Sequence, residues 1–255
     1  GGGTQTTTLT FDTVEQFAGA SLDRSVFPLS SQVHLTLTDL WLNIDPTDED
    51  SWTFGTQSSN STSFGAYYQV FDENGIANGD TVENGVIQLT QSTLQTMMIE
   101  TNGLVRVNAN TQSAANPVLT LQDNGDSVLT CNTSNSATTC HTNGYGTTGN
   151  ELGDGSVPVT VTEQGPNSGI FGSYDETDKS VLKITTNAAR GTSATVDYNE
   201  SPVTILVGFN FATIDIQPTD DEWTSGEEIP LVLVDNDANK NSRADEDLDV
   251  NNPDT

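Results

Sequence analysis

Short runs in which apolar and polar residues alternate recur along this chain. The clearest runs are residues 33–37, 157–161, 181–184 and 203–207. A period of two places alternate side chains on opposite faces of a β-strand, so each run predicts a strand with one face in a core. Asn-Gly pairs, which favour tight hairpin turns, recur in the segment between the first two of these runs. The pattern predicts an all-β protein, and we expect an Ig-like β-sandwich of antiparallel sheets.

One strand pattern occurs twice in the sequence. Residues 33–50 align with residues 229–246, a shift of 196 positions, because Leu231 falls on Leu35 (231 − 35 = 196). An aromatic residue and a polar turn precede the strand in both copies. The matched residues are Phe27 with Trp223, Leu29-Ser-Ser with Ser225-Gly-Glu, Leu35 with Leu231, Leu37 with Leu233, Asp39 with Asp235, and Asn43 with Asn239. This repeat predicts one complete domain followed by the start of a second.

The repeat divides the chain into three parts. Residues 1–15 are interpreted as an N-terminal tail or incoming strand, 16–216 as an Ig-like β-sandwich, and 217–255 as the start of a second Ig-like domain. An ordinary Ig-like sandwich has about 100 residues, so the first domain is too long. We therefore expect a large insertion at about residues 55–155. The alternative is two sandwiches that meet near Asn116-Pro117, but no further copy of the Asp-containing start occurs there.

The chain is strongly acidic, with 36 Asp and Glu against 7 Lys and Arg and a formal charge of −29. Nucleic acid is excluded as a partner because phosphate binding needs clustered basic residues. The charge also repels anionic lipid and attracts cations. Two interpretations stay open: a well-solvated surface, or folding or assembly that depends on bound divalent ions. Apolar content is low at 33%, but the apolar residues are gathered in the alternating runs, which argues against disorder.

Carboxylate and amide side chains gather directly after both copies of the repeated strand. They are Asp235, Asp237, Asn239, Asn241, Asp245, Glu246 and Asp247 in the second copy, and Asp39, Asn43 and Asp45 in the first. Such hard oxygen ligands suit calcium or another divalent cation. The second loop matches five ligand positions of an EF-hand, yet Lys240 stands where that loop needs Gly and a strand precedes it. We therefore expect a calcium loop at a sheet edge; the alternative is a solvated loop in which Asp and Asn cap turns.

The two cysteines, Cys131 and Cys140, lie in a polar segment. A metal site would need more ligands than the neighbouring His141, so we expect a disulfide formed outside the cytoplasm. Three sequons are compatible with glycosylation in such a compartment: Asn60, Asn132 and Asn199. No apolar run of membrane length occurs, so we expect no direct membrane insertion by this segment. The ends carry no terminal signal, which suggests a segment of a longer protein.

No motif for catalysis is found, and we expect the chain not to be an enzyme. It lacks a G-x-S-x-G elbow, a P-loop, an H-E-x-x-H motif and a Cys-His nucleophile arrangement. Paired carboxylates for glycoside hydrolysis occur in any acidic chain and stay possible in principle. Aromatic residues that could instead stack on sugar rings, or plug a sandwich core, are Trp41, Trp52, Trp223, Tyr67 and Tyr68.

Three ordered motifs resemble the repeating Ig-like domain of large surface-layer proteins from ammonia-oxidising archaea. They read LTDLWLNIDPTDEDSW from residue 37, VPVTVTEQGPNSGIFGSYDET from residue 157 and AARGTSATVDYNES from residue 188. In that family, the stretch matching Thr162–Phe171 is a strand, turn and strand, and the stretch matching Gly191–Tyr198 is a late strand. The resemblance covers roughly residues 20–54 and 156–255, and it leaves out the middle segment with the cysteine pair.

The resemblance implies a structural cell-envelope protein that self-assembles with other copies into an extracellular surface-layer lattice. It also implies glycosylation, dependence on divalent cations, and enrichment of cations, ammonium included, at the cell surface. An extracellular adhesin or filament subunit built of Ig-like domains is the alternative. A secreted carbohydrate-binding or carbohydrate-active fragment is the second alternative.

Overall fold

The described residues of the chain form an all-β structure. The computed structural model describes residues 18–56, 64–71, 87–90, 105–108, 118–122, 129–131, 140–142, 150–151, 159–174, 177–198, 201–218 and 220–247. They contain eighteen strands and a single-turn 3-10 helix, Leu40–Leu42. The predicted all-β class is confirmed, and the packed sheets are those of a β-sandwich. Within the described ranges, no helix has the length and apolar character needed to cross a membrane.

The larger layer is a seven-stranded antiparallel sheet. It joins strands from both ends of the domain, because β3 pairs with β13 and β12 pairs with β4. Its order is β1 (Gly19–Leu22), β3 (Leu35–Thr38), β13 (Ile170–Gly172), β12 (Val159–Glu163), β4 (Glu49–Thr56), β5 (Phe64–Phe71) and β6 (Ile87–Thr90).

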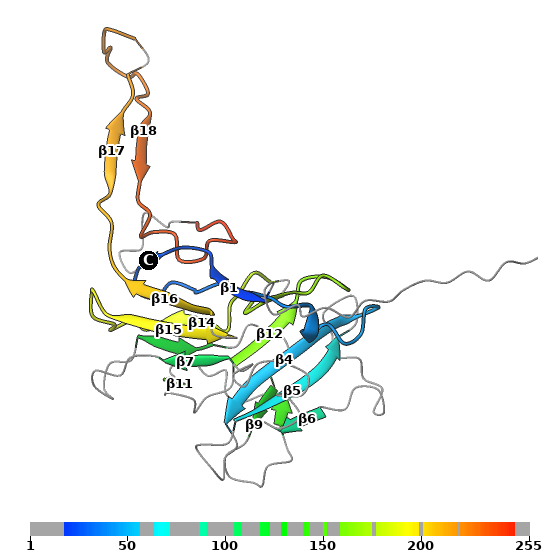
Figure 1. Cartoon of the computed structure of the whole chain (residues 1–255). Helices are drawn as coiled ribbons and strands as arrows, with labels where there is room; N and C mark the ends of the chain where they lie inside the picture. Colours follow the sequence, from blue (N-terminus) through cyan, green and yellow to red (C-terminus); the bar gives the residue numbers. More distant parts are fainter. Residues whose placement is uncertain are drawn as a thin grey trace, which may run out of the picture.

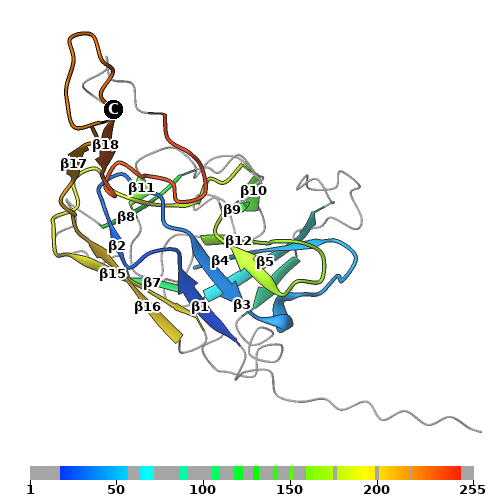
Figure 2. The ribbon, with the colours of Figure 1, turned by 90° about the horizontal axis from the view of Figure 1, so that it is seen from above.

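A four-stranded sheet forms the facing layer (Figures 1 and 2). Its order is β2 (Val26–Phe27), β16 (Ser201–Val207), β15 (Ser193–Tyr198) and β7 (Arg106–Asn108). The pairing of β2 with β16 is parallel, and the other pairs are antiparallel. The remaining sheets are β11 (Asn150–Glu151) with β8 (Leu119–Leu121) and β14 (Leu182–Ile184); β9 (Leu129–Cys131) with β10 (Cys140–Thr142); and β17 (Thr213–Ile216) with β18 (Leu231–Val234).

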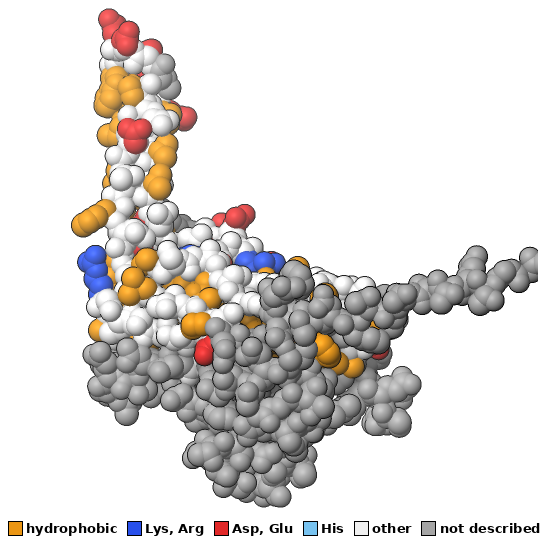
Figure 3. Space-filling view, in the orientation of Figure 1, with side chains coloured by type: hydrophobic (Ala, Val, Ile, Leu, Met, Phe, Trp, Pro, Cys, Tyr) orange, Lys and Arg blue, Asp and Glu red, His pale blue; other side chains and the backbone are white. Residues whose placement is uncertain are grey.

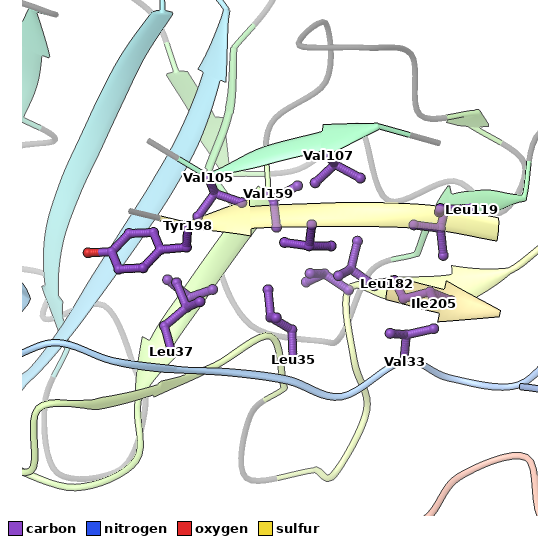
Figure 4. Packing of buried hydrophobic residues seen from close by; sticks show 14 of the residues in the cluster. Val33, Leu35, Leu37, Val105, Val107, Leu119, Val159, Leu182, Tyr198 and Ile205 are labelled. Atoms are coloured by element: carbon purple, nitrogen blue, oxygen red, sulfur yellow. The ribbon is translucent and has the colours of Figure 1, made fainter. Parts of the chain in front are cut away.

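The core lies between these layers and is built from the inward phase of each strand (Figure 4). Along β15, for example, Ala194, Val196 and Tyr198 are buried and the residues between them are not fully buried. Leu35 and Leu37 of β3 face the same core and are fully buried. The period of two in the sequence therefore reports the inward face of the sheets.

Each of the four alternating runs overlaps a strand, namely β3, β12, β14 and β16, as predicted. Where the structure describes the segment predicted as an insertion, about residues 55–155, several of its strands belong to the sandwich sheets. Its strands β5 and β6 extend the edge of the seven-stranded sheet, and β7 forms the edge of the facing sheet. The domain boundaries themselves stay a prediction.

The hairpin of β17 and β18 projects away from the sandwich beyond the end of β16 (Figure 1). All eight residues of the two strands are exposed. The chain then returns from β18 to the sandwich surface through residues 235–247, which we call the acidic loop. No other layer of the described structure packs on this hairpin.

The cysteine pair has the register that a disulfide needs. Strands β9 and β10 are antiparallel, and Cys131 lies opposite Cys140. Opposite residues in such a pair have Cα atoms roughly 4.5 to 5.5 Å apart. That separation lies within the range that a disulfide spans, about 4.4 to 6.8 Å.

We expect replacement of Cys131 and Cys140 by Ser to lower the free energy of unfolding by roughly 2 to 3 kcal/mol, because a cross-link restricts the unfolded chain. Urea denaturation of the purified protein measures this loss. Wild-type protein treated with reductant is the control and should lose the same amount. Two reactive thiols in unreduced, denatured wild-type protein would contradict the predicted bond.

Candidate functional site

The acidic loop is fastened to the sandwich by an arginine at the end of β1. Arg24 donates from Nη1 to the carbonyl oxygen of Asn239 over 2.9 Å and from Nη2 to Asn239 Oδ1 over 3.0 Å. Beside it, the amide of Gln32 donates to the carbonyl oxygen of Lys240 over 2.7 Å. A planar guanidinium fixes both distance and direction when it donates two bonds to one residue. Asn239 is therefore held by backbone and side chain together.

A second contact uses the other arginine of this region. Arg243 Nε donates to Asp178 Oδ1 over 2.7 Å, and its guanidinium lies 4.0 Å from the centre of the Tyr174 ring. Asn241 Nδ2 donates to the carbonyl oxygen of Asp178 over 2.7 Å. Residues 239–243 of the acidic loop thus contact the sandwich at two places, one around Arg24 and Gln32 and the other around Tyr174 and Asp178. We call these contacts together the loop dock.

The loop dock also brings together a serine, a histidine and an aspartate. Ser242 Oγ donates to Asp23 Oδ2 over 2.5 Å and lies 3.1 Å from His34 Nδ1. His34 Nδ1 lies 3.4 Å from the same Asp23 oxygen, and its Nε2 lies 3.3 Å from the carbonyl oxygen of Asp178.

This arrangement is not a nucleophilic triad. In such a triad the serine and the aspartate contact opposite ring nitrogens, whereas here both contact Nδ1 of His34. The serine hydroxyl donates to the aspartate and is not activated by the ring. Burial raises the pKa of Asp23, but hydrogen bonds from His34 and Ser242 and the charges of His34 and Arg24 outweigh burial and lower it. The three residues therefore anchor the loop.

Within the acidic loop, several of the predicted metal ligands accept hydrogen bonds from the protein. Asp235 Oδ1 accepts from the amide of Asp237 over 2.9 Å. Asp237 in turn accepts from the amide of Asn210 over 2.8 Å. Glu246 Oε1 accepts from the amides of Lys240 and Asn241. The glutamate at the last EF-hand position thus closes the loop through backbone amides, and Asp245, Glu246 and Asp247 are exposed.

In the first copy of the repeat, a buried carboxylate also accepts hydrogen bonds from the protein. Asp39 Oδ1 accepts from the amide of Trp41 over 2.8 Å, and Asp39 Oδ2 accepts from the hydroxyl of Tyr198 over 2.5 Å. Asp39 is buried, and this burial raises its pKa, although both hydrogen bonds act to lower it. Burial and the charge of Asp39 raise the pKa of Tyr198, which keeps its hydroxyl protonated as the donor.

The other predicted ligands of the first copy lie in the turn that follows. Asp45 Oδ1 accepts from the amide of Thr47 over 2.9 Å and from its hydroxyl over 2.6 Å, and these hydrogen bonds lower the pKa of Asp45. Asn43 Nδ2 donates to Asn167 Oδ1 over 2.9 Å. The side chain of Asp45 therefore caps a turn, which was the alternative interpretation of these residues.

Two carboxylates, those of Asp50 and Glu163, are buried in the core, which the sequence did not lead us to expect. Asp50 Oδ2 accepts from the amides of Ile44 over 2.5 Å and Asp45 over 3.2 Å. Glu163 Oε1 accepts from the amide of Gly169 over 2.8 Å, and its Oε2 accepts from the amide of Asp50 over 3.3 Å. Both residues are almost completely buried. A signal existed, because Asp50 shares its strand phase with Trp52 and Phe54, and Glu163 shares its phase with Val159 and Val161.

The predicted calcium site stays a prediction. In the part of the chain that the structure describes, no group of three or more His, Cys, Asp or Glu side chains is arranged to hold a metal ion. The structure brings Asp235, Asp237, Asn239, Asn241 and Glu246 into one loop, while Asp39, Asn43 and Asp45 belong to a separate turn. The three predicted glycosylation positions, Asn60, Asn132 and Asn199, lie outside the described residues.

We expect Tyr198→Phe to destabilise the protein by about 1 to 3 kcal/mol at neutral pH, because the buried Asp39 carboxylate loses a donor. Below pH 3.8, the ordinary pKa of Asp39, the carboxyl is protonated in both folded and unfolded chains, so the loss should shrink there. Urea denaturation at both pH values measures it. Tyr174→Phe is the matched control, since the Tyr174 hydroxyl lies 3.4 Å from the neutral Thr36 hydroxyl. An equal loss at both pH values would contradict this account.

Replacing Arg24 by Lys should release the acidic loop from the sandwich, because an ammonium group cannot donate the fixed pair of bonds to Asn239. Hydrogen exchange of amides 239–246 should become roughly tenfold to a hundredfold faster, since a charged hydrogen-bonded contact contributes about 1.5 to 3 kcal/mol. Arg190→Lys is the control, because the Arg190 guanidinium lies over Phe209 instead. Unchanged exchange in the Arg24 variant would show that the contact does not hold the loop.

Comparison with known proteins identified no relative of this chain. No protein-family model matches the chain, and no curated protein matches it in sequence.

Proposed function

We propose that the chain is a non-enzymatic, extracellular Ig-like β-sandwich module of an archaeal surface-layer lattice. The observation that supports this proposal most directly is the loop dock. The acidic loop, which follows the projecting hairpin, is fastened to the sandwich by Arg24, Arg243 and the group around His34. A fixed joint between successive repeats is what a wall-forming protein needs, and a flexible linker would not hold the spacing of a lattice.

The acidity of the chain fits an assembly that takes up cations. A net charge of −29 makes copies repel one another at low ionic strength. Divalent cations among the exposed carboxylates of the acidic loop would remove that repulsion, and oxygen-rich loops of this kind suit calcium. In this proposal the acidic surface also concentrates other cations, ammonium included.

Two alternative functions, an adhesin or filament subunit and a carbohydrate-binding fragment, predict different properties of the protein. An adhesin or filament subunit would use the same modules in a thread, so electron microscopy of assembled protein separates it from a lattice by shape. A carbohydrate-binding fragment would need exposed aromatic rings. Trp52 is fully buried, and its indole donates to the carbonyl oxygen of Leu42 over 2.7 Å, so it is not available for stacking on sugars. Trp41 and Trp223 are 36% and 59% exposed, and this alternative would have to use these two rings.

Calcium should raise the thermal midpoint of the chain and promote flat assemblies. Binding to the native state alone adds about 2.7 kcal/mol of stability at a hundredfold excess over the dissociation constant. Calorimetry with calcium, then with chelator, measures the shift, and negative-stain microscopy scores the assemblies. Sodium chloride at matched ionic strength is the control for simple screening.

A pair of charge-matched variants locates the effect. Asp245→Asn with Asp247→Asn should remove most of the calcium-dependent shift, because both residues belong to the acidic loop. Asp220→Asn with Asp221→Asn removes the same charge from exposed residues before β18 and should keep the shift. A midpoint that sodium raises as much as calcium would contradict the cation proposal, and turnover of a polysaccharide panel would contradict the non-enzymatic one.

A further inference from the structure

The β17–β18 hairpin presents an apolar face to solvent. Ile214 lies opposite Leu233, and Ile216 lies opposite Leu231, so the four side chains share one face of the hairpin. Their exposed fractions are 66%, 50%, 49% and 61% in that order. Figure 3 shows apolar side chains along the projecting hairpin and acidic ones at its tip. We call these four residues the hairpin face. A two-stranded hairpin with such a face is marginally stable unless another layer covers it.

The same arrangement occurs in the sandwich, where it is covered. Strands β1 and β3 pair with Leu22 opposite Leu35 and Ala20 opposite Leu37, and both leucines of β3 are fully buried. The bounds of β18, Leu231–Val234, fall on those of β3, Leu35–Thr38, at the shift of 196 residues. The strand that pairs with β18 is shifted by two residues relative to the strand that pairs with β3. A shift of two residues keeps every side chain on the same face.

The turn before the strand is also repeated in the backbone. Ser30 has φ 62° and Gly226 has φ 88°, and these two residues correspond at the shift of 196. The amide of Ser31 donates to the carbonyl oxygen of Pro28 over 3.3 Å, and the equivalent bond from Glu227 to Thr224 is 3.2 Å. A left-handed residue after the same turn is a specific match, because such conformations are uncommon outside glycine.

The turn after the strand repeats as well. The amide two residues after each aspartate donates to its carboxylate, at 2.8 Å for Asp39 and 2.9 Å for Asp235. The amide three residues after each aspartate donates to its carbonyl oxygen, at 3.2 Å for Asp39 and 3.3 Å for Asp235. The hairpin is therefore the opening of the sandwich built a second time, up to the point where a covering layer is needed.

The sandwich itself shows what the covering layer is. Strand β13 lies along the free edge of β3, with Phe171 opposite Leu37. The sheet of β15 and β16 packs over the same leucines, and Tyr198 of β15 donates to the second oxygen of Asp39. The edge of β18 away from β17 pairs with no other strand among the described residues.

We propose that the hairpin face is the docking surface for the second sheet of a following unit of the same repeat. A strand equivalent to β13 pairs with the free edge of β18, and strands equivalent to β15 and β16 cover Leu231 and Leu233. A tyrosine of that sheet, equivalent to Tyr198, donates its hydroxyl to Asp235 Oδ2. A second copy of this chain fits the face less well, because it would bring another −29 of charge to the acidic hairpin tip. The inference does not depend on cations or on a lattice.

The test supplies the missing layer from the chain's own first repeat. Residues 52–218 are appended after Asp247, which keeps the shift of 196 residues. In this extended chain, exchange of the β18 amides should become at least about a hundredfold slower than in the chain as it stands. Leu233→Asp should abolish that protection and lower the midpoint of the added unit. Val232→Asp is the matched control, because Val232 lies on the other face, opposite Asp215.

Three outcomes would overturn the proposal. The first is β18 exchange that does not change in the extended chain while the original sandwich stays folded. The second is an equal effect of Leu233→Asp and Val232→Asp. The third is a dimer of the unextended chain, detected by light scattering, with protected β18 amides, since a second copy would then be the occupant. Tyr198→Phe in the appended copy should destabilise the added unit as it does the original. None of these results depends on the calcium experiment.

Discussion

A scarcity of positive side chains governs how this protein is built. With 36 carboxylate residues and 7 lysines and arginines, it cannot pair its acids one by one. Backbone amides and hydroxyl groups take that role at the strand ends: amides hold Asp50 and Glu163, and Tyr198 completes Asp39. Buried carboxylates with hydrogen-bond donors are tolerated, whereas unsatisfied ones are costly. The exits of β3 and β12 and the start of β4 therefore depend on turns that point N–H groups at carboxylates.

Three of the seven basic residues, Arg24, Lys240 and Arg243, lie where the acidic loop meets the sandwich. Arg24 reaches from the sandwich to Asn239 of the acidic loop, and Arg243 reaches from the loop to Asp178 of the sandwich. Each uses a planar guanidinium, which fixes orientation better than an ammonium group does. The direction in which the hairpin projects is thus set by two arginines and by the Asp23, His34 and Ser242 group.

Sequence periodicity predicted the strands because it reflects local chemistry, and the residues shared at a shift of 196 predicted the repeat. Contacts between distant segments left no such pattern. Arg24 and Asn239 are 215 residues apart, and neither belongs to an alternating run. The parallel pairing of β2 with β16 and the weaving of β5, β6 and β7 into the two layers also depend on tertiary packing. Asp50 and Glu163 are an intermediate case. The alternation of each strand indicates that their side chains face the core, but it does not indicate which amides donate to them.

The two aspartate turns separate local from tertiary causes. Asp235 makes the same two backbone hydrogen bonds as Asp39, although the strand before Asp235 is exposed and the strand before Asp39 is buried. The turn therefore does not require a core around the strand. It is stabilised locally by the hydrogen bonds between the Asp residue and the amides that follow it. Burial adds the tyrosine and raises the pKa of Asp39. In the proposed series of repeats, such a strand exit would let units be joined one after another, because the hairpin that opens each unit would already be held by the unit before it.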